Sequence, residues 1–260
     1  MTTRTIILAA AVLVITGAAS AAPLIVKKDY EGFTVYIDCR NHGPIAYEMT
    51  LGPDQGDVTR LSGFKIDPTV PAECQMTTGD TFKVTDAEEA AFGKFQRGHL
   101  ADANSLDGGR QSMADSFFVT NMLPQAARFN GGGGAWRRTE EISECYREKV
   151  VLRIWGGVIW GNDATNDVFV DTHNVITPDR WWKVLFREDT DTHIAWIFEN
   201  NKDEKRAVMD DRIVTLEELK QQIEFIPDFG PAEGSVASTT TWELSGSNPL
   251  KCEGTEADPG

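Results

Sequence analysis

The stretch FQRGHLAD, residues 95–102, and the stretch TNMLPQAARFNGGGGAWRRTE, residues 120–140, together decide the fold of this 260-residue sequence. The first stretch places Arg97 and His99 at the edge between a predicted strand and a loop rich in glycine, serine and aspartate. The second stretch ends 41 residues after the histidine and adds two asparagines and a glutamate. The two stretches therefore gather polar side chains of several types into one part of the chain.

These side chains have complementary chemistry. His99 can accept a proton near neutral pH, and Arg97 matches the geometry of a phosphate group. The amide oxygens of Asn121 and Asn130 suit a hard cation. With the carboxylate of Glu140, these groups can assemble a site that cleaves phosphodiester bonds. The other three histidines lie in a turn or in strand-like surroundings, and we interpret them as surface or satisfied residues.

The first 21 residues are typical of a cleaved secretory signal. Arg4 supplies a positive start, and residues 5–17 form an apolar stretch that is short for a membrane span. Ala19-Ser20-Ala21 offers the small residues that a signal peptidase reads, so we expect cleavage before Ala22 and secretion to the periplasm or the cell exterior. A short membrane anchor is the alternative. No later segment is apolar enough to span a bilayer, so we expect a mature form without membrane contact.

The charge balance restricts the class of protein. The formal net charge is −15, which argues against a protein that wraps nucleic acid, because phosphate binding normally depends on a basic surface. An enzyme that concentrates a few arginines in one cleft remains compatible with this charge. Arg60, in the polar loop predicted for residues 52–70, is a candidate for such a cleft.

Four cysteines, at positions 39, 74, 145 and 252, are expected to form two disulfides in an oxidising compartment. Because no two of them lie two to four residues apart, their spacing matches no zinc site. Four cysteines allow three pairings. We favour Cys39–Cys74 together with Cys145–Cys252.

Alternating and β-rich segments predict a sheet. An early hairpin is expected in residues 33–51, with its turn at residues 41–44. Further strands are predicted at residues 116–125, 150–161, 180–188 and 192–200, the last two as a hairpin. Because strands and helices are interleaved, we predict an α+β fold with a mixed, largely antiparallel sheet.

Capping signals mark the helices. Thr85 followed by Glu88, and Thr215 followed by Glu218, are capping-box patterns that begin helices. The last of these helices is expected to reach residue 225, and a further amphipathic helix is expected to end near Lys149. We predict one domain over residues 22–230 and a flexible acidic tail over residues 231–260, tied by Cys252.

The two stretches quoted above resemble the paired signature of the DNA/RNA non-specific endonucleases, the family of the Serratia nuclease and of mitochondrial endonuclease G. That signature reads roughly DRGH-x-A, then [ST]-N-[MI]-x-P-Q, then F/L-N-x-G-x-W-x-x-L-E. The likeness covers about residues 30 to 226 and includes Ala46-Tyr47, Thr59-Arg60 and Trp182-Lys183-Val184. It implies a ββα-metal nuclease core and a magnesium-dependent hydrolase, with manganese as a substitute, that cuts DNA and RNA with little base specificity.

The resemblance also implies a role for each candidate residue. His99 corresponds to the general base that activates water, and Asn130 to the single protein ligand of the metal ion. Glu140 corresponds to the acid that holds the water shell of the metal. This agrees with magnesium chemistry, because the ion commonly keeps several waters and few protein ligands. The phosphate-facing arginines correspond to Arg97 and Arg60, and an amide that supports the site corresponds to Asn121.

The sequence departs from the family pattern at three places. Gln96 stands where the pattern has an acid, so one hydrogen bond can persist but the charge is lost. Four glycines follow Asn130, which places Glu140 ten residues after it where the pattern has about eight. Two extra residues on a continuous helix would turn Glu140 by about 200°, so we expect the helix to begin near Ala135 with the extra residues looped out. Thr139 replaces a leucine.

Two interpretations stay open beside the enzyme. The glycine run, residues 131–134, is interpreted as a flexible linker rather than a phosphate cradle, because no GK[ST] follows it. The net acidity, Gln96 and the glycine insertion also permit a secreted nucleic-acid-binding protein on a weakened nuclease scaffold. The sequence leaves the oligomeric state and the preference between DNA and RNA open.

Overall fold

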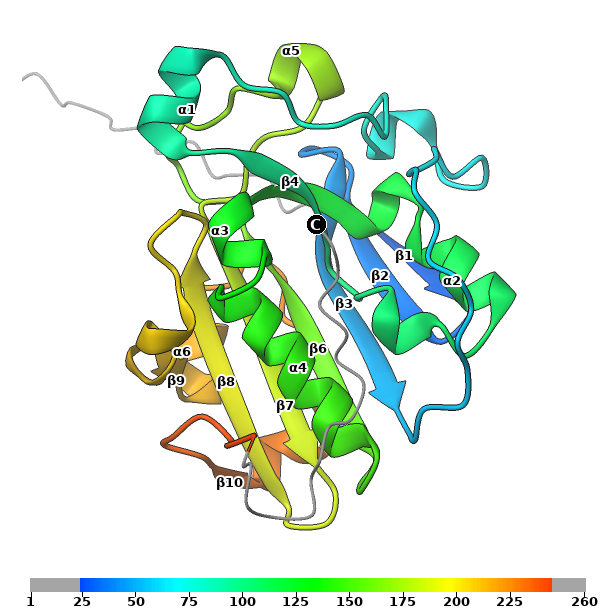
Figure 1. The fold of residues 1–260 in the computed structure, drawn as a ribbon, viewed down its shortest axis with the longest axis vertical. Helices are drawn as coiled ribbons and strands as arrows, with labels where there is room; N and C mark the ends of the chain where they lie inside the picture. The colour runs from blue at the N-terminus through cyan, green and yellow to red at the C-terminus, as the bar shows by residue number, and fades with distance from the viewer. Residues whose placement is uncertain (1–23, 245–260) are drawn as a thin grey trace, which may run out of the picture.

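The computed structural model of the protein describes residues 24–244 (Figure 1). The predicted signal segment, residues 1–21, and Cys252 lie outside the described residues. Within the described range, no helix has the length and apolar character needed to cross a membrane.

One eight-stranded sheet forms the centre of the molecule (Figure 1). Its strands lie in the order β1-β2-β3-β6-β7-β8-β10, and β9 pairs with β8 as well. Every pair is antiparallel except β8 with β10, which is parallel. The strands are β1 (Ile25–Tyr30), β2 (Phe33–Asp38), β3 (Gly43–Leu51), β6 (Leu152–Ile159), β7 (Arg180–Arg187), β8 (Thr192–Glu199), β9 (Ile213–Val214) and β10 (Val236–Ala237).

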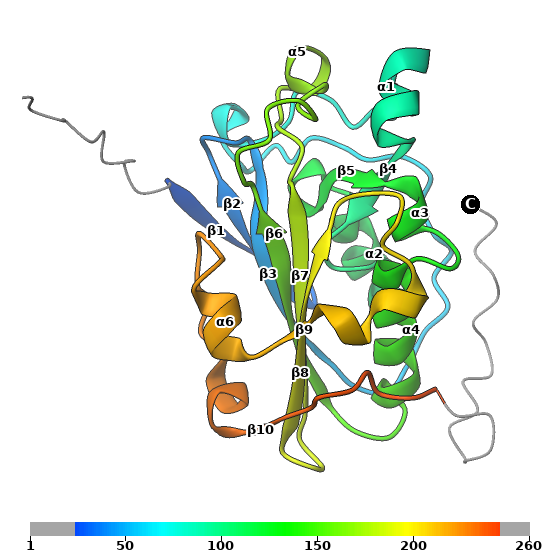
Figure 2. The same cartoon turned by 90° about the vertical axis from the view of Figure 1, so that its left-hand side faces the viewer.

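The helices are short and lie on both faces of this sheet. Figure 2 shows α4 on one face and α6 on the other. The α-helices are α1 (Asp86–Phe92), α2 (Arg110–Ser116), α3 (Ala127–Asn130), α4 (Ala135–Arg147), α5 (Val170–His173) and α6 (Leu216–Lys220). Because both faces are covered, β6, β7 and β8 are buried almost throughout, and their sequences form nearly continuous apolar runs.

A separate two-stranded hairpin crosses the face of the sheet that carries α4. It consists of β4 (Phe95–His99) and β5 (Met122–Ala126), which pair antiparallel with His99 opposite Met122. Helix α3 follows β5 directly, and α4 begins five residues after α3 ends. This strand–strand–helix order is the arrangement that the ββα-metal prediction requires.

Aromatic packing fixes α4 and the hairpin against the sheet. Trp136 on α4 and Trp181 on β7 are fully buried with their ring centroids 4.9 Å apart, and Phe129 on α3 packs edge-on against both. Aromatic pairs of this kind contribute about 0.5–1.5 kcal/mol each beyond the area that they bury. The helix that carries Glu140 therefore has little freedom to move relative to the sheet.

Most predicted elements are present. The early hairpin, the central strand, the β7–β8 hairpin and both capping boxes are confirmed. Helix α4 begins at Ala135, as the spacing argument requires. The last helix ends at Lys220, five residues earlier than expected, because residues 221–225 continue only as a turn.

Two segments differ from the prediction. Residues 116–121 are not a strand: they hold the end of α2 and a 3-10 turn, Val119–Asn121. The side chain of Asn121 donates a hydrogen bond to the Ser116 carbonyl, which closes the backbone into a turn. The loop expected before this segment contains α2.

The predicted tail is also ordered as far as residue 244. A 3-10 helix, Gly230–Gly234, is followed by β10, whose Val236 amide donates to the Asp191 carbonyl. Trp242 is buried against Tyr146, with ring centroids 5.3 Å apart. Apolar contact and strand pairing thus order residues that look polar and flexible in the sequence.

The predicted Cys39–Cys74 disulfide is present and closes a loop of sequence separation 35. It joins the end of β2 to the long loop that carries Arg60. The second predicted pair, Cys145–Cys252, includes a residue outside the described part of the chain.

Candidate active site

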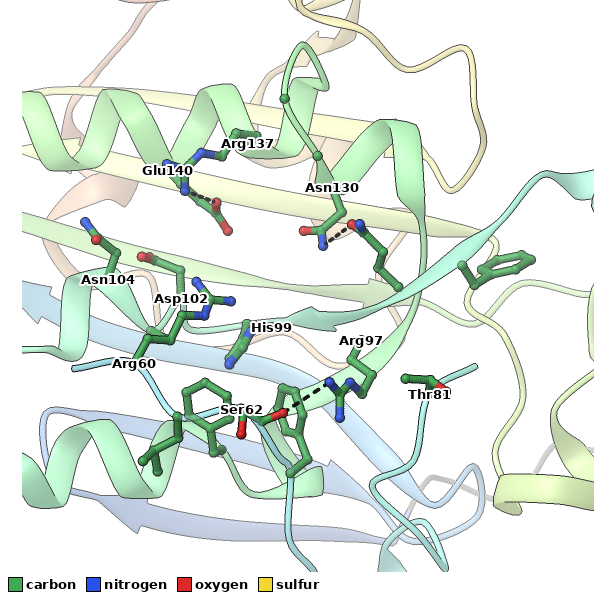
Figure 3. A pocket seen from close by; sticks show the side chains of 18 of the residues that line it. Arg60, Ser62, Thr81, Arg97, His99, Asp102, Asn104, Asn130, Arg137 and Glu140 are labelled. Atoms are coloured by element: carbon green, nitrogen blue, oxygen red, sulfur yellow. Dashed lines mark hydrogen bonds and ion pairs between the residues drawn. The ribbon is translucent and has the colours of Figure 1, made fainter. Parts of the chain in front are cut away.

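A cavity of about 680 Å³ opens where the β4–β5 hairpin meets α4 (Figure 3). Five of the six predicted site residues line it, namely Arg60, Arg97, His99, Asn130 and Glu140. They come from the long loop after β3, from β4, from α3 and from α4. The sequence-predicted residues are therefore brought together, with one exception.

The exception is Asn121, which is fully buried and does not line the cavity. Its Oδ1 accepts a hydrogen bond from the Ala101 amide at 2.9 Å, and its Nδ2 donates to the carbonyls of Ala101 at 2.8 Å and Ser116 at 3.0 Å. The Asn121 side chain thus holds the loop that follows His99, beneath the cavity, and has no group left for a substrate.

His99 is the last residue of β4 and is 6% exposed. Its ring lies between Phe64 and Phe117, with centroid distances of 4.7 Å and 5.0 Å. Burial lowers the pKa of His99 well below its ordinary value of 6.5, and the charges of Arg60 and Arg97 lower it further. The imidazole is therefore neutral at physiological pH and can accept a proton.

Gly98 sets the position of the histidine. A Cβ atom at Gly98 would overlap the side chain of Gln125, which lies one strand away on β5. Only glycine permits this close approach of β4 to β5. The Arg-Gly-His order in the sequence is therefore a packing requirement as well as a chemical one.

The two predicted phosphate-binding arginines pack against Phe64 and Phe117, the same two rings that contact His99. The guanidinium carbon of Arg97 lies 5.4 Å from the Phe64 ring centroid, and that of Arg60 lies 5.9 Å from the Phe117 centroid. Arg97 also donates hydrogen bonds to the Gly79 carbonyl at 3.2 Å and the Ser62 carbonyl at 3.3 Å. These contacts hold both guanidinium groups at the mouth of the cavity (Figure 3).

Asn130 and Gln96 form an amide–amide pair. The Asn130 Nδ2 donates a hydrogen bond to the Gln96 Oε1 at 3.0 Å, and Figure 3 shows the Asn130 oxygen turned to the other side, into the cavity. Gln96 is the residue that replaces the acid of the family pattern. Its amide oxygen accepts the hydrogen bond that orients Asn130, without contributing a negative charge.

Glu140 lies across the cavity from this pair, near the start of α4. Arg137 donates to its Oε2 at 3.3 Å. Burial and the neighbouring Asp102 raise the pKa of Glu140 to about 7, although Lys183 and Arg137 act in the opposite direction. A cation bound nearby would therefore favour the ionised form of the Glu140 carboxylate.

Three further residues belong to the site but were not predicted from the sequence. Asp102 is buried and accepts hydrogen bonds from the Ser105 amide and hydroxyl. Lys183 on β7 is 1% exposed, with its Nζ 3.9 Å from the Trp136 ring centroid. In the sequence, Lys183 could have been recognised as unusual because it is a single lysine within the apolar run RWWKVLFR. Arg137, which lines the cavity, carried no signal beyond its helical position.

The oxygen atoms in the cavity fit a hard divalent cation. Within residues 24–244, no group of three or more histidine, cysteine or acidic residues could enclose a metal ion. Asn130 Oδ1 and the Glu140 carboxylate are hard oxygen donors on opposite sides of one cavity. Magnesium suits such a sparse set, because it binds through few protein oxygens and keeps much of its water shell.

Comparisons with known proteins agree with this arrangement. A sequence model of the family described as DNA/RNA non-specific endonuclease matches residues 18–229. Human mitochondrial endonuclease G is 23% identical over 229 residues, which cover 82% of this chain and 73% of that protein. Mouse mitochondrial nuclease EXOG is 27% identical over 137 residues. These residues cover 47% of this chain and 32% of that protein, so the match spans about a third of its length.

The fold is shared with a solved structure. The crystal structure of an EndoG/EndoGI complex contains a chain that superposes with a TM-score of 0.61 at 15% identity. The match covers 83% of this chain and 91% of that chain. The predicted α+β class with a ββα-metal core is confirmed.

The raised pKa of Glu140 predicts how stability changes with pH. Between its ordinary value of 4.5 and about 7, the folded protein holds this proton more tightly than the unfolded chain, so the Glu140 contribution to the free energy of unfolding falls as pH rises. Glu140→Gln removes this ionisation. In urea unfolding with a chelator, the stability of Glu140→Gln relative to wild type should rise from pH 5 to pH 7.5.

The exposed Glu217 on α6 supplies the control. Glu217→Gln is measured in parallel over the same pH range. A constant or falling difference for Glu140→Gln would show that the Glu140 carboxyl does not resist ionisation in the folded protein.

Proposed function

The chain belongs to the DNA/RNA non-specific endonuclease family, and on this premise we propose that it hydrolyses phosphodiester bonds of DNA and RNA with the help of a magnesium ion. One observation carries the proposal: the neutral imidazole of His99 and the amide oxygen of Asn130, which is turned into the cavity, share that cavity. A phosphate group that enters this cavity has a proton acceptor on one side and an oxygen ligand for a cation on the other.

His99 acts as the general base. The Nε2 atom of this ring is buried and makes no hydrogen bond within the described residues. We therefore propose that Nδ1 accepts the proton from the attacking water. A base of low pKa is weak, but the negative phosphate also offsets the charges of Arg60 and Arg97, which depress that pKa. Substrate binding thus raises the basicity of the imidazole at the moment when it is used.

Arg60 and Arg97 bind the non-bridging oxygens of the phosphate. Their guanidinium groups are planar donors that match these oxygens. Because Arg97 already uses two donors on the Gly79 and Ser62 carbonyls, its orientation is fixed before substrate arrives. These contacts involve the phosphate backbone alone, which supports the proposal that the enzyme acts on both DNA and RNA with little base preference.

Asn130 and Glu140 would hold the magnesium ion. Asn130 Oδ1 would be the direct ligand, and the Glu140 carboxylate would accept hydrogen bonds from the metal's water shell. The bound ion would supply charge stabilisation for the leaving oxygen. Arg137 keeps the Glu140 carboxylate turned toward the cavity through its 3.3 Å hydrogen bond.

Two of the three departures from the family pattern, Gln96 and the glycine insertion, are accommodated in the folded protein. Gln96 orients Asn130 through a 3.0 Å hydrogen bond, and the glycine run is looped out so that α4 begins at Ala135. The net charge of −15 is the remaining feature that counts against an active nuclease, and a weakened scaffold is the alternative. We prefer the enzyme, because a candidate general base, two arginines and two oxygen donors for a cation line one cavity.

We also propose that the mature protein is secreted. The N-terminal signal pattern supports this, and so does the Cys39–Cys74 disulfide, because disulfides persist in oxidising compartments.

Removal of the imidazole tests the proposed base. His99→Ala should lower the rate of magnesium-dependent plasmid nicking by at least about 10²-fold, the lower range for general-base catalysis. Loss of one buried ring should leave the protein folded, as a melting curve would show. His42→Asn is the matched control, because His42 is outside the cavity and asparagine tolerates its positive φ. Nicking by His99→Ala at more than about a tenth of the wild-type rate would remove His99 from the mechanism.

Gln96 is expected to act on the metal site through Asn130. Gln96→Ala removes the acceptor for the Asn130 Nδ2, so Asn130 Oδ1 loses its fixed direction, and metal affinity should fall about tenfold, as for other residues that orient a ligand. Gln96→Asp keeps an acceptor and adds a charge, so its affinity should equal or exceed that of wild type. Titration with Mn²⁺ followed by electron paramagnetic resonance measures both. Equal affinities for Gln96→Ala and wild type would contradict the orienting role.

A further inference from the structure

The glycine run is a docking site rather than a linker. Residues 203–206 lie against it: the Arg206 amide donates to the Gly133 carbonyl at 3.0 Å, and the Ala135 amide donates to the Glu204 carbonyl at 3.1 Å. Gly134 and Lys205 pair as an antiparallel bridge. The glycine run therefore pairs through its backbone with residues 204–206, and the bridged residues Gly134 and Lys205 are 71 positions apart in the chain.

Only glycine permits this pairing. A Cβ atom at Gly134 would overlap the carbonyl oxygens of Phe129 and Arg128. Gly133 has a φ of +90°, a conformation that side chains rarely adopt. The interpretation of the run as a flexible linker is therefore corrected, because Gly133 is required by its backbone conformation and Gly134 by close backbone contacts.

The docked segment brings Arg206 to the rim of the active site. Arg206 lines the catalytic cavity and also a second cavity of about 700 Å³ that lies along α4. Its guanidinium pairs with Glu141, whose carboxylate also holds Arg137 at 3.8 Å and Arg138 at 3.2 Å. One carboxylate thus fixes three arginines, and Arg138 lines the second cavity with Arg206.

The second cavity is lined by acidic as well as basic side chains, because Asp210 and Glu243 lie in it with Arg138 and Arg206. Glu204 is buried and its carboxylate is neutralised by Arg212, with an Arg212 Nη2 to Oε1 distance of 2.6 Å. The basic side chains of Lys205 and Arg206, which are exposed, are left to face solvent from the docked segment. In a protein of net charge −15, these exposed basic side chains beside the catalytic cavity are groups to which a phosphate can bind.

We propose that Arg206 and Arg138 form a second binding site for backbone phosphates of the nucleic acid, next to the scissile position and held in place by the glycine run. The proposal rests on the proposed function, since a nucleic-acid strand bound at His99 must leave the catalytic cavity. Arg206 lines both cavities, so a strand that leaves the catalytic cavity beside Arg206 would reach the second cavity along α4.

The ligand of this second site is a phosphate rather than a base. The aromatic rings beside it are already occupied, because the Arg187 guanidinium lies 4.6 Å from the Tyr146 ring centroid and 5.4 Å from the Trp242 centroid. Tyr146 and Trp242, the aromatic residues that line this cavity, are each 8% exposed and therefore offer little surface for base stacking. Binding there is therefore independent of sequence and sensitive to salt.

Binding of a labelled duplex of about 20 base pairs, in a chelator that prevents cleavage, tests the proposal. Arg206→Ala should weaken binding about fivefold or more and make the slope of log K against log salt concentration shallower by about 1, as for one lost phosphate contact. Arg153→Ala is the matched control, because Arg153 pairs with Glu188 and lines neither cavity. Equal affinity and equal salt slope for Arg206→Ala and Arg153→Ala would overturn the proposal.

Two glycine variants test the docking. Gly133→Ala strains the positive φ and should weaken duplex binding as Arg206→Ala does, whereas Gly132→Ala, where a Cβ meets no atom within 4 Å, should bind as wild type. Combining Gly133→Ala with Arg206→Ala should add no further loss, since both act through one contact. Additive losses would overturn the role of the glycine run. Because these measurements need no cleavage, they succeed or fail separately from the proposed hydrolysis.

Discussion

The pairing of β4 with β5 is the constraint on which the site depends. This short hairpin ends at His99 on one strand and runs directly through α3 to Asn130 on the other. One piece of backbone therefore fixes both the proton acceptor and the expected metal ligand. Asn121 closes the hairpin from below with three hydrogen bonds, and each such buried bond costs about 1–3 kcal/mol to leave unmade. The relative positions of His99 and Asn130 are therefore set by the backbone of β4, β5 and α3.

Charge is distributed so that an acidic protein can attract an acidic substrate. The arginines at positions 60, 97, 137 and 206 all line one cavity, while the surplus of carboxylates lies elsewhere. Beneath the cavity, Asp102 and Glu140 are buried beside Lys183, a cluster that would be costly if any member lost its counter-charge. A cation above this cluster would reduce the repulsion between the two carboxyl groups. The metal affinity that we propose would therefore depend on these buried charges.

The sequence predicted those parts of the molecule whose causes are local. The capping boxes at Thr85 and Thr215 act within four residues, and the start of α4 at Ala135 followed from the family spacing together with the geometry of a single helix. Long-range contacts were not predictable. The amide pair of Gln96 with Asn130 and the docking of Arg206 on the glycine run join residues 34 and more than 70 positions apart. The turn at residues 116–121 escaped prediction because a side chain, rather than backbone propensity, closes it.

A crystal structure of His99→Ala with Mn²⁺ and a short duplex would test the central claim most directly, because the anomalous signal of manganese locates the ion without assumptions. We expect one ion bound directly to Asn130 Oδ1, with water as its other non-phosphate ligands and the scissile phosphate between it and residue 99. An ion bound by other side chains, or a phosphate on another surface, would contradict the account.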